Sequence, residues 1–154
     1  MALYSFDSSA FINPFRRYYP QDLFPKFWDA VTERIASGEI IASEVVRDEI
    51  DQKDDQLKVW VRSQTGLFVP VDEEQQDGVA EILSRYPNWV DVESSKNNAD
   101  PFVIALAQAK SLTVVADEAN GSDQNPKIPH VCKLYRVRYL RVVDFIREIG
   151  LRFT

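Results

Sequence analysis

The sequence predicts a three-layer α/β/α domain with a central parallel sheet. Along the whole chain, short apolar segments of strand character alternate with segments in which apolar residues recur at helical spacing. The run "LTVVAD", residues 112–117, has no polar alternation, which is typical of a strand buried on both faces of a parallel sheet. Since folds of this class bind ligands beyond the carboxyl ends of their strands, we expect the functional residues at that edge.

Capping and turn residues mark the order of the elements. Strands are expected over residues 2–7, 39–43, 66–71, 112–117 and 137–142. Helices are expected over residues 24–37, 43–64, 72–86 and 98–111, around 131–135 and from 144 onward, with an ordered loop over 14–20. Ser43 and Asp72 stand where they can cap the helices that follow them. The chain shows no internal repeat or linker, so a single domain over residues 1–154 is expected.

Composition limits the class of protein. The chain has 154 residues, is 45% hydrophobic and 27% charged, and contains one cysteine, Cys132. A chain of this length buries roughly 70% of its unfolded surface, so its core needs neither a disulfide nor a structural metal. Because one thiol forms no internal disulfide and no signal peptide opens the sequence, we expect a cytoplasmic protein. No run approaches the ~20 apolar residues of a membrane span.

The charge balance restricts the way in which the chain can bind nucleic acid. Its formal net charge of −6 argues against a protein that holds nucleic acid through bulk electrostatics. An acidic chain can still act on phosphodiesters if divalent cations neutralise some of its carboxylates. The sequence lacks the motifs G-x-G-x-x-G and Walker A, so dinucleotide and P-loop chemistry are disfavoured.

Four acidic residues occupy positions that are unusual for charged side chains. Asp7 and Asp117 each end a predicted strand, and Asp100 opens the apolar run "PFVIALA". Glu49 lies on the apolar stripe of its own predicted helix. Because parallel strands end at one edge of a sheet, we expect the four acids to converge there. Glu118, the residue after Asp117, is the alternative to it.

Each of these acids also has a purely structural explanation. An Asp followed by Pro, as in Asp100–Pro101, is a common helix start in which the Asp caps the helix and binds nothing. In the equivalent explanations Asp7 caps the turn at Ser8, and Glu49 pairs with a buried arginine. Asp7 is the harder residue to explain in this way, because an unpaired charge at the end of a central strand is costly.

Acids that converge at one edge predict a metal site. Like charges in close proximity raise one another's pKa unless a cation lies among them. Carboxylate oxygens without His or Cys are the ligands of Mg²⁺ or Mn²⁺. Such a cation binds a phosphodiester, activates water for in-line attack and stabilises the leaving oxygen, so the single histidine, His130, is not needed as a base. The predicted catalytic and metal-binding residues are Asp7, Glu49, Asp100 and Asp117.

In their order along the chain, these positions resemble the motifs of the PIN-domain nucleases, a family that includes the ribonuclease toxins of bacterial and archaeal toxin–antitoxin pairs. "YSFDSSAFI" resembles the first motif and places Asp7, and "IIASEVVRDEI" resembles the second and places Glu49. "NNADPFVIALAQAKSLTVVADE" is similar to the third and fourth motifs and places Asp100 and Asp117. Many PIN nucleases carry Asn at the position of Ser9, and the loop after the fourth motif is longer here.

This resemblance implies a function and partners. It implies a Mg²⁺- or Mn²⁺-dependent endoribonuclease that hydrolyses RNA phosphodiesters, and most specifically the toxin of a toxin–antitoxin pair. A small basic antitoxin would suit the acidic surface, and the family implies a homodimer. The alternatives are a catalytically inactive PIN-like binding module and a nuclease directed at DNA.

One further segment, "NPFRRYYP", combines basic and aromatic residues. Arg16 and Arg17 stand beside Tyr18 and Tyr19, and these residue types contact phosphates and stack on unpaired bases. Packing of this segment against the domain is the alternative that we favour, since aromatic side chains are usually buried.

Overall fold

In the computed structural model, which describes residues 1–91, 93 and 98–154, five strands form one sheet. The strands are β1 (Tyr4–Phe6), β2 (Ile40–Ser43), β3 (Phe68–Val69), β4 (Thr113–Val115) and β5 (Tyr139–Leu140). Their order in the sheet is β3-β2-β1-β4-β5, and every neighbouring pair is parallel. The central parallel sheet predicted from the alternation of elements is therefore confirmed.

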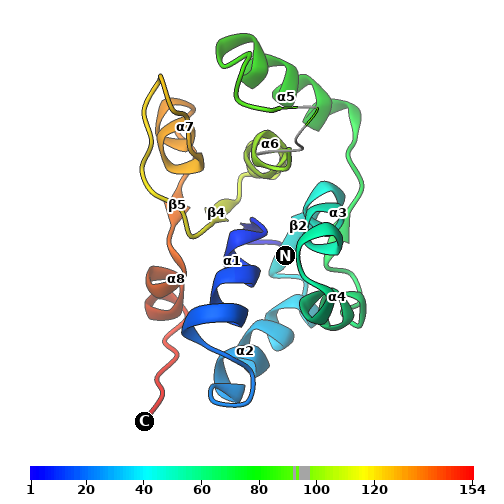
Figure 1. Cartoon of the computed structure of the whole chain (residues 1–154), viewed down its shortest axis with the longest axis vertical. Helices are drawn as coiled ribbons and strands as arrows, with labels where there is room; N and C mark the ends of the chain where they lie inside the picture. Colours follow the sequence, from blue (N-terminus) through cyan, green and yellow to red (C-terminus); the bar gives the residue numbers. More distant parts are fainter. Residues whose placement is uncertain (92, 94–97) are drawn as a thin grey trace.

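Helices cover both faces of this sheet (Figure 1). They are α1 (Ser9–Asn13), the π-helix η1 (Pro14–Tyr18), α2 (Pro25–Ala36), α3 (Glu44–Lys53), α4 (Asp55–Arg62), α5 (Glu73–Arg85), α6 (Asp100–Lys110), α7 (Ile128–Leu134) and α8 (Val142–Glu148). Figure 1 shows α6 and α7 over one face, with α5 outside them, and α1, α2 and α8 on the opposite side. The three α/β/α layers are thus as predicted. No helix in the described part of the chain is long and apolar enough to span a membrane.

The central strand β1 is the point at which the chain changes its direction across the sheet. Tyr4 of β1 pairs with Ile40 of β2 on one side and with Thr113 of β4 on the other. The chain runs outward from β1 to β2 and β3, and then returns through α5 and α6 to β4. Ligand sites of open α/β sheets lie beyond the strand ends at such a switch point. Residues that follow β1 and β4 therefore meet at one edge.

Apolar side chains from the strands and the inner helix faces form the core. The rings of Phe6 and Phe145 are both fully buried and meet edge to face with their centroids 5.2 Å apart. Ser5, the polar residue of β1, is also buried, and its Oγ donates a hydrogen bond to the carbonyl oxygen of Val103 in α6 at 2.9 Å. This bond fixes the first turns of α6 against β1, so the start of α6 is held close to the end of β1.

The segment predicted as an ordered loop begins with a π-helix instead. The backbone N–H of Tyr19 donates to the carbonyl oxygen of Pro14 at 2.8 Å, which closes a turn over five residues. Proline fits the start of a helical turn because its φ is fixed and it has no N–H to lose. The ring of Tyr19 stacks on Phe27 at 4.9 Å, and Trp28 Nε1 donates to the Tyr19 carbonyl at 2.6 Å. The predicted packing of this segment against the domain is therefore confirmed for Tyr19.

The helix predicted over residues 43–64 is two helices, because Asp54 interrupts it. Asp54 has an extended backbone (φ −150°, ψ 107°), so α3 ends at Lys53. Its Oδ1 accepts hydrogen bonds from the backbone N–H groups of Gln56 at 3.1 Å and Leu57 at 3.0 Å, which caps α4. The apolar periodicity continues across the break, so periodicity alone did not reveal it.

Candidate metal centre

Asp7 follows β1 directly and is 2% exposed. Its backbone N–H donates to the carbonyl oxygen of Val115 at 2.9 Å, so β1 and β4 hold it at the edge of the sheet. Its Oδ2 accepts hydrogen bonds from Ser9, at 3.1 Å from the backbone nitrogen and 2.6 Å from Oγ. Its Oδ1 is buried and has no hydrogen-bond partner among the described residues. Local capping thus explains one carboxylate oxygen and leaves the other without a partner.

Asp100 is the first residue of α6 and is 3% exposed. Ala99 occupies the N-cap position, and no side chain of the described residues makes the capping bond there. Asp100 Oδ2 is buried without a hydrogen-bond partner in the described part of the chain. The capping explanation is therefore wrong for this residue. Asn97, the first residue of the motif quoted around Asp100, lies outside the described residues.

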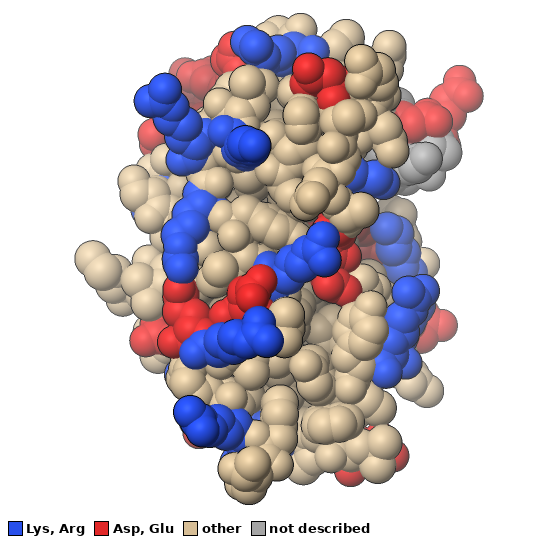
Figure 2. Space-filling view, turned by 90° about the vertical axis from the view of Figure 1, so that its left-hand side faces the viewer, with Lys and Arg blue, Asp and Glu red and all other residues tan. Residues whose placement is uncertain are grey.

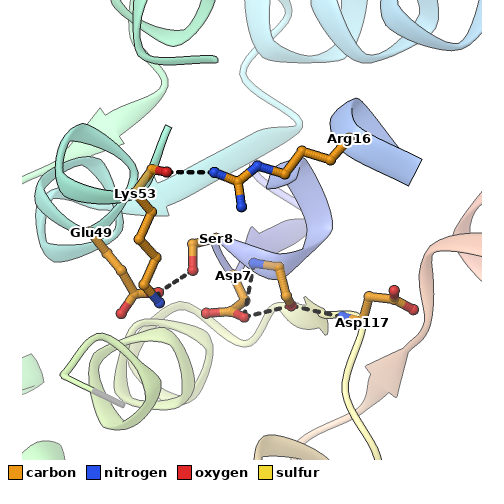
Figure 3. A network of polar contacts seen from close by, with 7 residues as sticks. Asp7, Ser8, Arg16, Glu49, Lys53 and Asp117 are labelled. Atoms are coloured by element: carbon orange, nitrogen blue, oxygen red, sulfur yellow. Dashed lines mark hydrogen bonds and ion pairs between the residues drawn. The ribbon is translucent and has the colours of Figure 1, made fainter. Parts of the chain in front are cut away.

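Glu49 lies on the inner face of α3 and is mostly buried. Ser43 caps this helix as predicted, because its Oγ accepts a hydrogen bond from the N–H of Val45 at 3.3 Å. The Glu49 carboxylate accepts a hydrogen bond from the hydroxyl group of Ser8, and Lys53 Nζ lies 3.5 Å from its Oε1 (Figure 3). Its ionic partner is thus a lysine one turn further along α3, and not the buried arginine of the structural explanation.

The two acids after β4 lie in different surroundings. Asp117 Oδ2 accepts a hydrogen bond from Asn13 Nδ2 at 2.9 Å, and Figure 3 shows the Asp117 side chain directed away from Asp7. Glu118 Oε2 accepts a hydrogen bond from the N–H of Ile128 at 3.0 Å, at the start of α7. The hydroxyl of Tyr139 donates to the Glu118 carbonyl at 3.4 Å. Hydrogen bonds therefore hold both the side-chain carboxylate and the backbone carbonyl of Glu118.

Asp7, Asp100 and Glu118 form an acidic cluster. Each of them offers one carboxylate oxygen, and these three oxygens lie within 4.8 Å of one another. Glu49 faces the same cavity of about 250 Å³. The other residues that line this cavity are Ser8, Ser9, Ile12, Asn13, Arg16 and Lys53. Of the four predicted acids the structure brings Asp7, Glu49 and Asp100 to one cavity, whereas Glu118 stands there in place of Asp117.

Burial and mutual repulsion raise the pKa of the clustered acids. Burial raises the pKa of Asp7 to about 7, and the charges of Glu118 and Glu49 contribute in the same direction. Burial, followed by the charges of Asp7, Glu118 and Glu49, places the pKa of Asp100 well above its usual range. The pKa of Glu118 is also raised, mainly by burial. The site is thus strained electrostatically in a way that a cation would relieve.

The donor set fits a hard divalent cation. All the atoms that the cluster offers as ligands are carboxylate oxygens, the donor type that hard cations prefer. Two of the carboxylates carry a buried oxygen that no described residue satisfies, and such an oxygen is available as a ligand. A cation bound at this position would also contact a phosphate group that entered the cavity.

Comparisons with known proteins agree with this architecture. A family model described as "Domain of unknown function (DUF4411)" matches residues 4–153. The chain belongs to this family. No curated protein matches the sequence of this DUF4411 chain at a significant level.

Solved structures identify the fold of the DUF4411 chain. The crystal structure of VapBC2 from Rickettsia felis, bound to a DNA fragment from their promoter, contains a similar chain with a TM-score of 0.55 and 10% identity over 90% of this chain and 98% of that one. FitAcB from Neisseria gonorrhoeae matches with a TM-score of 0.52 and 16% identity, over 90% of this chain and 96% of that one. PAE2754 from Pyrobaculum aerophilum matches with a TM-score of 0.50 and 12% identity, over 98% of both chains. The DUF4411 chain therefore has the PIN-domain fold of these proteins.

Several residues of the cavity were not identified from the sequence. Ser8 and Ser9 immediately follow Asp7, and small polar residues after a strand-end acid are the signal that could have indicated hydrogen bonds to carboxylates. The sequence indicates a phosphate contact for Arg16, but the aromatic residues beside it favour packing of the segment against the domain. Lys53 carried no signal, because a lysine at the end of an amphipathic helix is ordinary.

Proposed function

We propose that this DUF4411 protein is a metal-dependent endoribonuclease that hydrolyses RNA phosphodiesters. The observation that carries the proposal is the meeting of three carboxylate oxygens within 4.8 Å, from segments far apart in the chain, at the switch point of a PIN-like sheet. Neither capping nor ion pairing satisfies Oδ1 of Asp7 and Oδ2 of Asp100, which are buried and have no hydrogen-bond partner among the described residues. Acids that served only to cap helices would not need this arrangement.

In this proposal Mg²⁺ or Mn²⁺ is held by Asp7, Asp100 and Glu118, with Glu49 at the same cavity. When bound, the cation supplies Lewis-acid activation of the phosphodiester and of the attacking water. Ser9 orients Asp7 and Ser8 orients Glu49 through their hydroxyl groups.

The buried carboxyl groups of the cavity have two further roles in this proposal. Asp7 and Asp100 would neutralise the charge of the cation, because both line the cavity and are almost fully buried. Because its pKa is raised to about 7, the Asp7 carboxyl can hold a proton and release it when a cation binds.

The test is cleavage of a mixed-sequence RNA with Mn²⁺, with Mg²⁺ and with EDTA, by wild type, Asp7→Asn and Asp100→Asn. We expect cleavage only by the wild type and only with metal. Single-stranded DNA of the same sequence decides between the RNA- and DNA-directed nucleases. Metal-independent melting, together with an absence of cleavage that depends on Asp7, would instead identify the catalytically inactive binding module.

A role as the toxin of a toxin–antitoxin pair extends this proposal. It is supported by the PIN-like fold shared with chains of VapBC2 and FitAcB. A small basic antitoxin as partner, a homodimer and a cytoplasmic location are parts of the same proposal. Growth arrest on expression of wild type, with normal growth on expression of Asp7→Asn, is the expected result, and light scattering of the purified protein measures the oligomeric state.

A further inference from the structure

Two basic side chains line the acidic cavity, and a metal site alone does not explain their presence there. Arg16 comes from η1 and Lys53 from the last residue of α3, and both face the cavity that contains the acidic cluster. The two elements are far apart in the sequence, yet the Arg16 guanidinium donates a hydrogen bond to the carbonyl oxygen of Lys53. The Arg16 side chain is therefore held against the end of α3, where Lys53 stands.

The guanidinium of Arg16 is held in a fixed orientation. Its Nε donates to Asp54 Oδ2 at 2.6 Å, and one terminal nitrogen donates to the Lys53 carbonyl. Figure 3 shows the remaining terminal nitrogen pointing down toward Ser8 and Asp7. A guanidinium that uses one edge for structural bonds presents its free edge to a ligand with little loss of rotamer freedom. The Arg16 side chain is 48% exposed and lines the cavity.

Lys53 is arranged differently. Its Nζ lies 3.5 Å from Glu49 Oε1, and its side chain is 53% exposed. Lysine is a point charge on a flexible stem, so it can pair with Glu49 and then turn toward an anion that enters the cavity. Arg16 thus supplies a fixed contact and Lys53 an adjustable one.

The charge of the whole molecule provides no long-range attraction for RNA. The chain carries a formal net charge of −6. Figure 2 shows that, on the face it presents, Lys and Arg side chains are dispersed among Asp and Glu and form no continuous basic surface. Four acids in the cavity repel an RNA strand, and basic side chains that line the same cavity offset this repulsion by binding its phosphates.

We propose that Arg16 and Lys53 form a phosphate clamp that binds a phosphodiester of the RNA strand next to the scissile one. This inference rests on the proposed nuclease function. The clamp positions the strand, and the acidic cluster acts on the neighbouring phosphate. Arg16 and Lys53 are positioning residues in this scheme, because neither contacts the reacting atoms.

The experiment compares Arg16→Gln, Arg16→Lys and Lys53→Gln with Arg17→Gln, a matched control in the same π-helix that does not line the cavity. For cleavage we expect Arg16→Gln to raise KM about tenfold or more with little change in kcat. Lys53→Gln is expected to raise KM less, Arg16→Lys to fall between wild type and Arg16→Gln, and Arg17→Gln to match wild type.

A binding measurement separates the clamp from the chemistry. We would titrate a fluorescent single-stranded RNA into Asp100→Asn, with and without Arg16→Gln or Lys53→Gln, over a range of salt concentrations. Loss of one phosphate contact is expected to reduce the slope of log K against log salt by about 0.7. If cleavage fails but Arg16→Gln still weakens RNA binding, the nuclease proposal is wrong, and Arg16 contacts a phosphate in a binding module that has no scissile phosphate beside it.

The opposite outcome also has a clear meaning. If wild type cleaves RNA while Arg16→Gln and Lys53→Gln keep its KM and salt slope, the clamp is wrong and the nuclease stands. Thermal melting of each variant guards against misfolding, since Arg16 also joins η1 to Asp54. Should Arg16→Gln unfold, Lys53→Gln decides the matter, because Lys53 is a half-exposed side chain at the end of α3.

Discussion

The hydroxyl group of Ser9 donates a hydrogen bond of 2.6 Å to Oδ2 of Asp7. The same hydroxyl accepts a hydrogen bond from the backbone N–H of Asp117 at 2.8 Å, so it joins the segments that follow β1 and β4. A hydroxyl that donates to a ligating carboxylate fixes its orientation, and loss of such a bond typically weakens metal binding 10–100-fold. Ser9 therefore links the segment after β4 to Asp7 of the acidic cluster.

We predict that Ser9→Ala weakens Mn²⁺ binding by about tenfold or more. The measurement is isothermal titration of metal-free protein with Mn²⁺. Ser37→Ala is the control, because Ser37 is exposed and its hydroxyl donates to the nearby carbonyl of Arg34 at 3.0 Å, away from the acidic cluster. Equal Mn²⁺ affinities for Ser9→Ala and wild type would show that Ser9 does not orient the cluster.

The acid after β4 can be identified by metal-dependent melting. We predict that Mn²⁺ raises the Tm of wild type and of Asp117→Asn, and that it raises the Tm of Glu118→Gln and Asp100→Asn much less. The reason is that a ligand which binds only the folded state stabilises it, and Glu118 is the acid whose oxygen lies within 4.8 Å of those of Asp7 and Asp100. A Mn²⁺ response that Asp117→Asn abolishes and Glu118→Gln retains would reverse the assignment.

The sequence could not decide between Asp117 and Glu118. Side chains in an extended segment point alternately to opposite sides, so only one of two consecutive acids faces the cluster. Which one does so depends on the contacts that hold the segment, namely the bond from Asp117 N to Ser9 Oγ and the bonds from the Tyr139 hydroxyl. These are long-range contacts, and local sequence does not encode them.

The layers and the convergence of acids were predictable for a simpler reason. Strand ends of a parallel sheet meet at one edge whatever the details of packing, so Asp7 and the start of the helix at Asp100 were expected together. The phosphate clamp was not predictable, because it depends on a π-helix that displays Arg16 and on the helix break at Asp54. Neither feature changes the hydrophobic periodicity from which helices are predicted.

The acidic cluster makes a prediction about pH. Burial raises the folded-state pKa of Asp7 from 3.8 to about 7, so between these values the folded state binds more protons than the unfolded state. Proton linkage then requires that the contribution of Asp7 to the free energy of unfolding be greatest at the acidic end of this window and decrease as the pH rises to about 7. The raised pKa values of Asp100 and Glu118 act in the same direction.

For metal-free protein in EDTA we therefore predict a lower Tm at about pH 8 than at about pH 5, by about 3 °C or more. Asp7→Asn is expected to flatten this dependence and to raise the Tm at the higher pH, whereas the exposed control Asp29→Asn follows wild type. Saturating Mn²⁺ is expected to restore the Tm at the higher pH. A wild-type Tm that rises across the same window in EDTA would contradict the assignment of a protonated Asp7.

The loop that carries Glu118 depends on Gly121. Gly121 has φ +79°, and a Cβ built there would lie 2.7 Å from the backbone nitrogen of Lys127. This distance is too short for a real contact, so the backbone would have to shift. We predict that Gly121→Ala lowers stability by about 1–3 kcal/mol and also weakens Mn²⁺ binding, because the loop must shift and Glu118 is attached to its start. Gly66→Ala is the matched control: its φ is +81°, but no atom lies within 4 Å of the added Cβ. Chemical denaturation and Mn²⁺ titration of both variants test this, since equal losses in the two would attribute the whole effect to backbone φ and none to the close approach at Lys127.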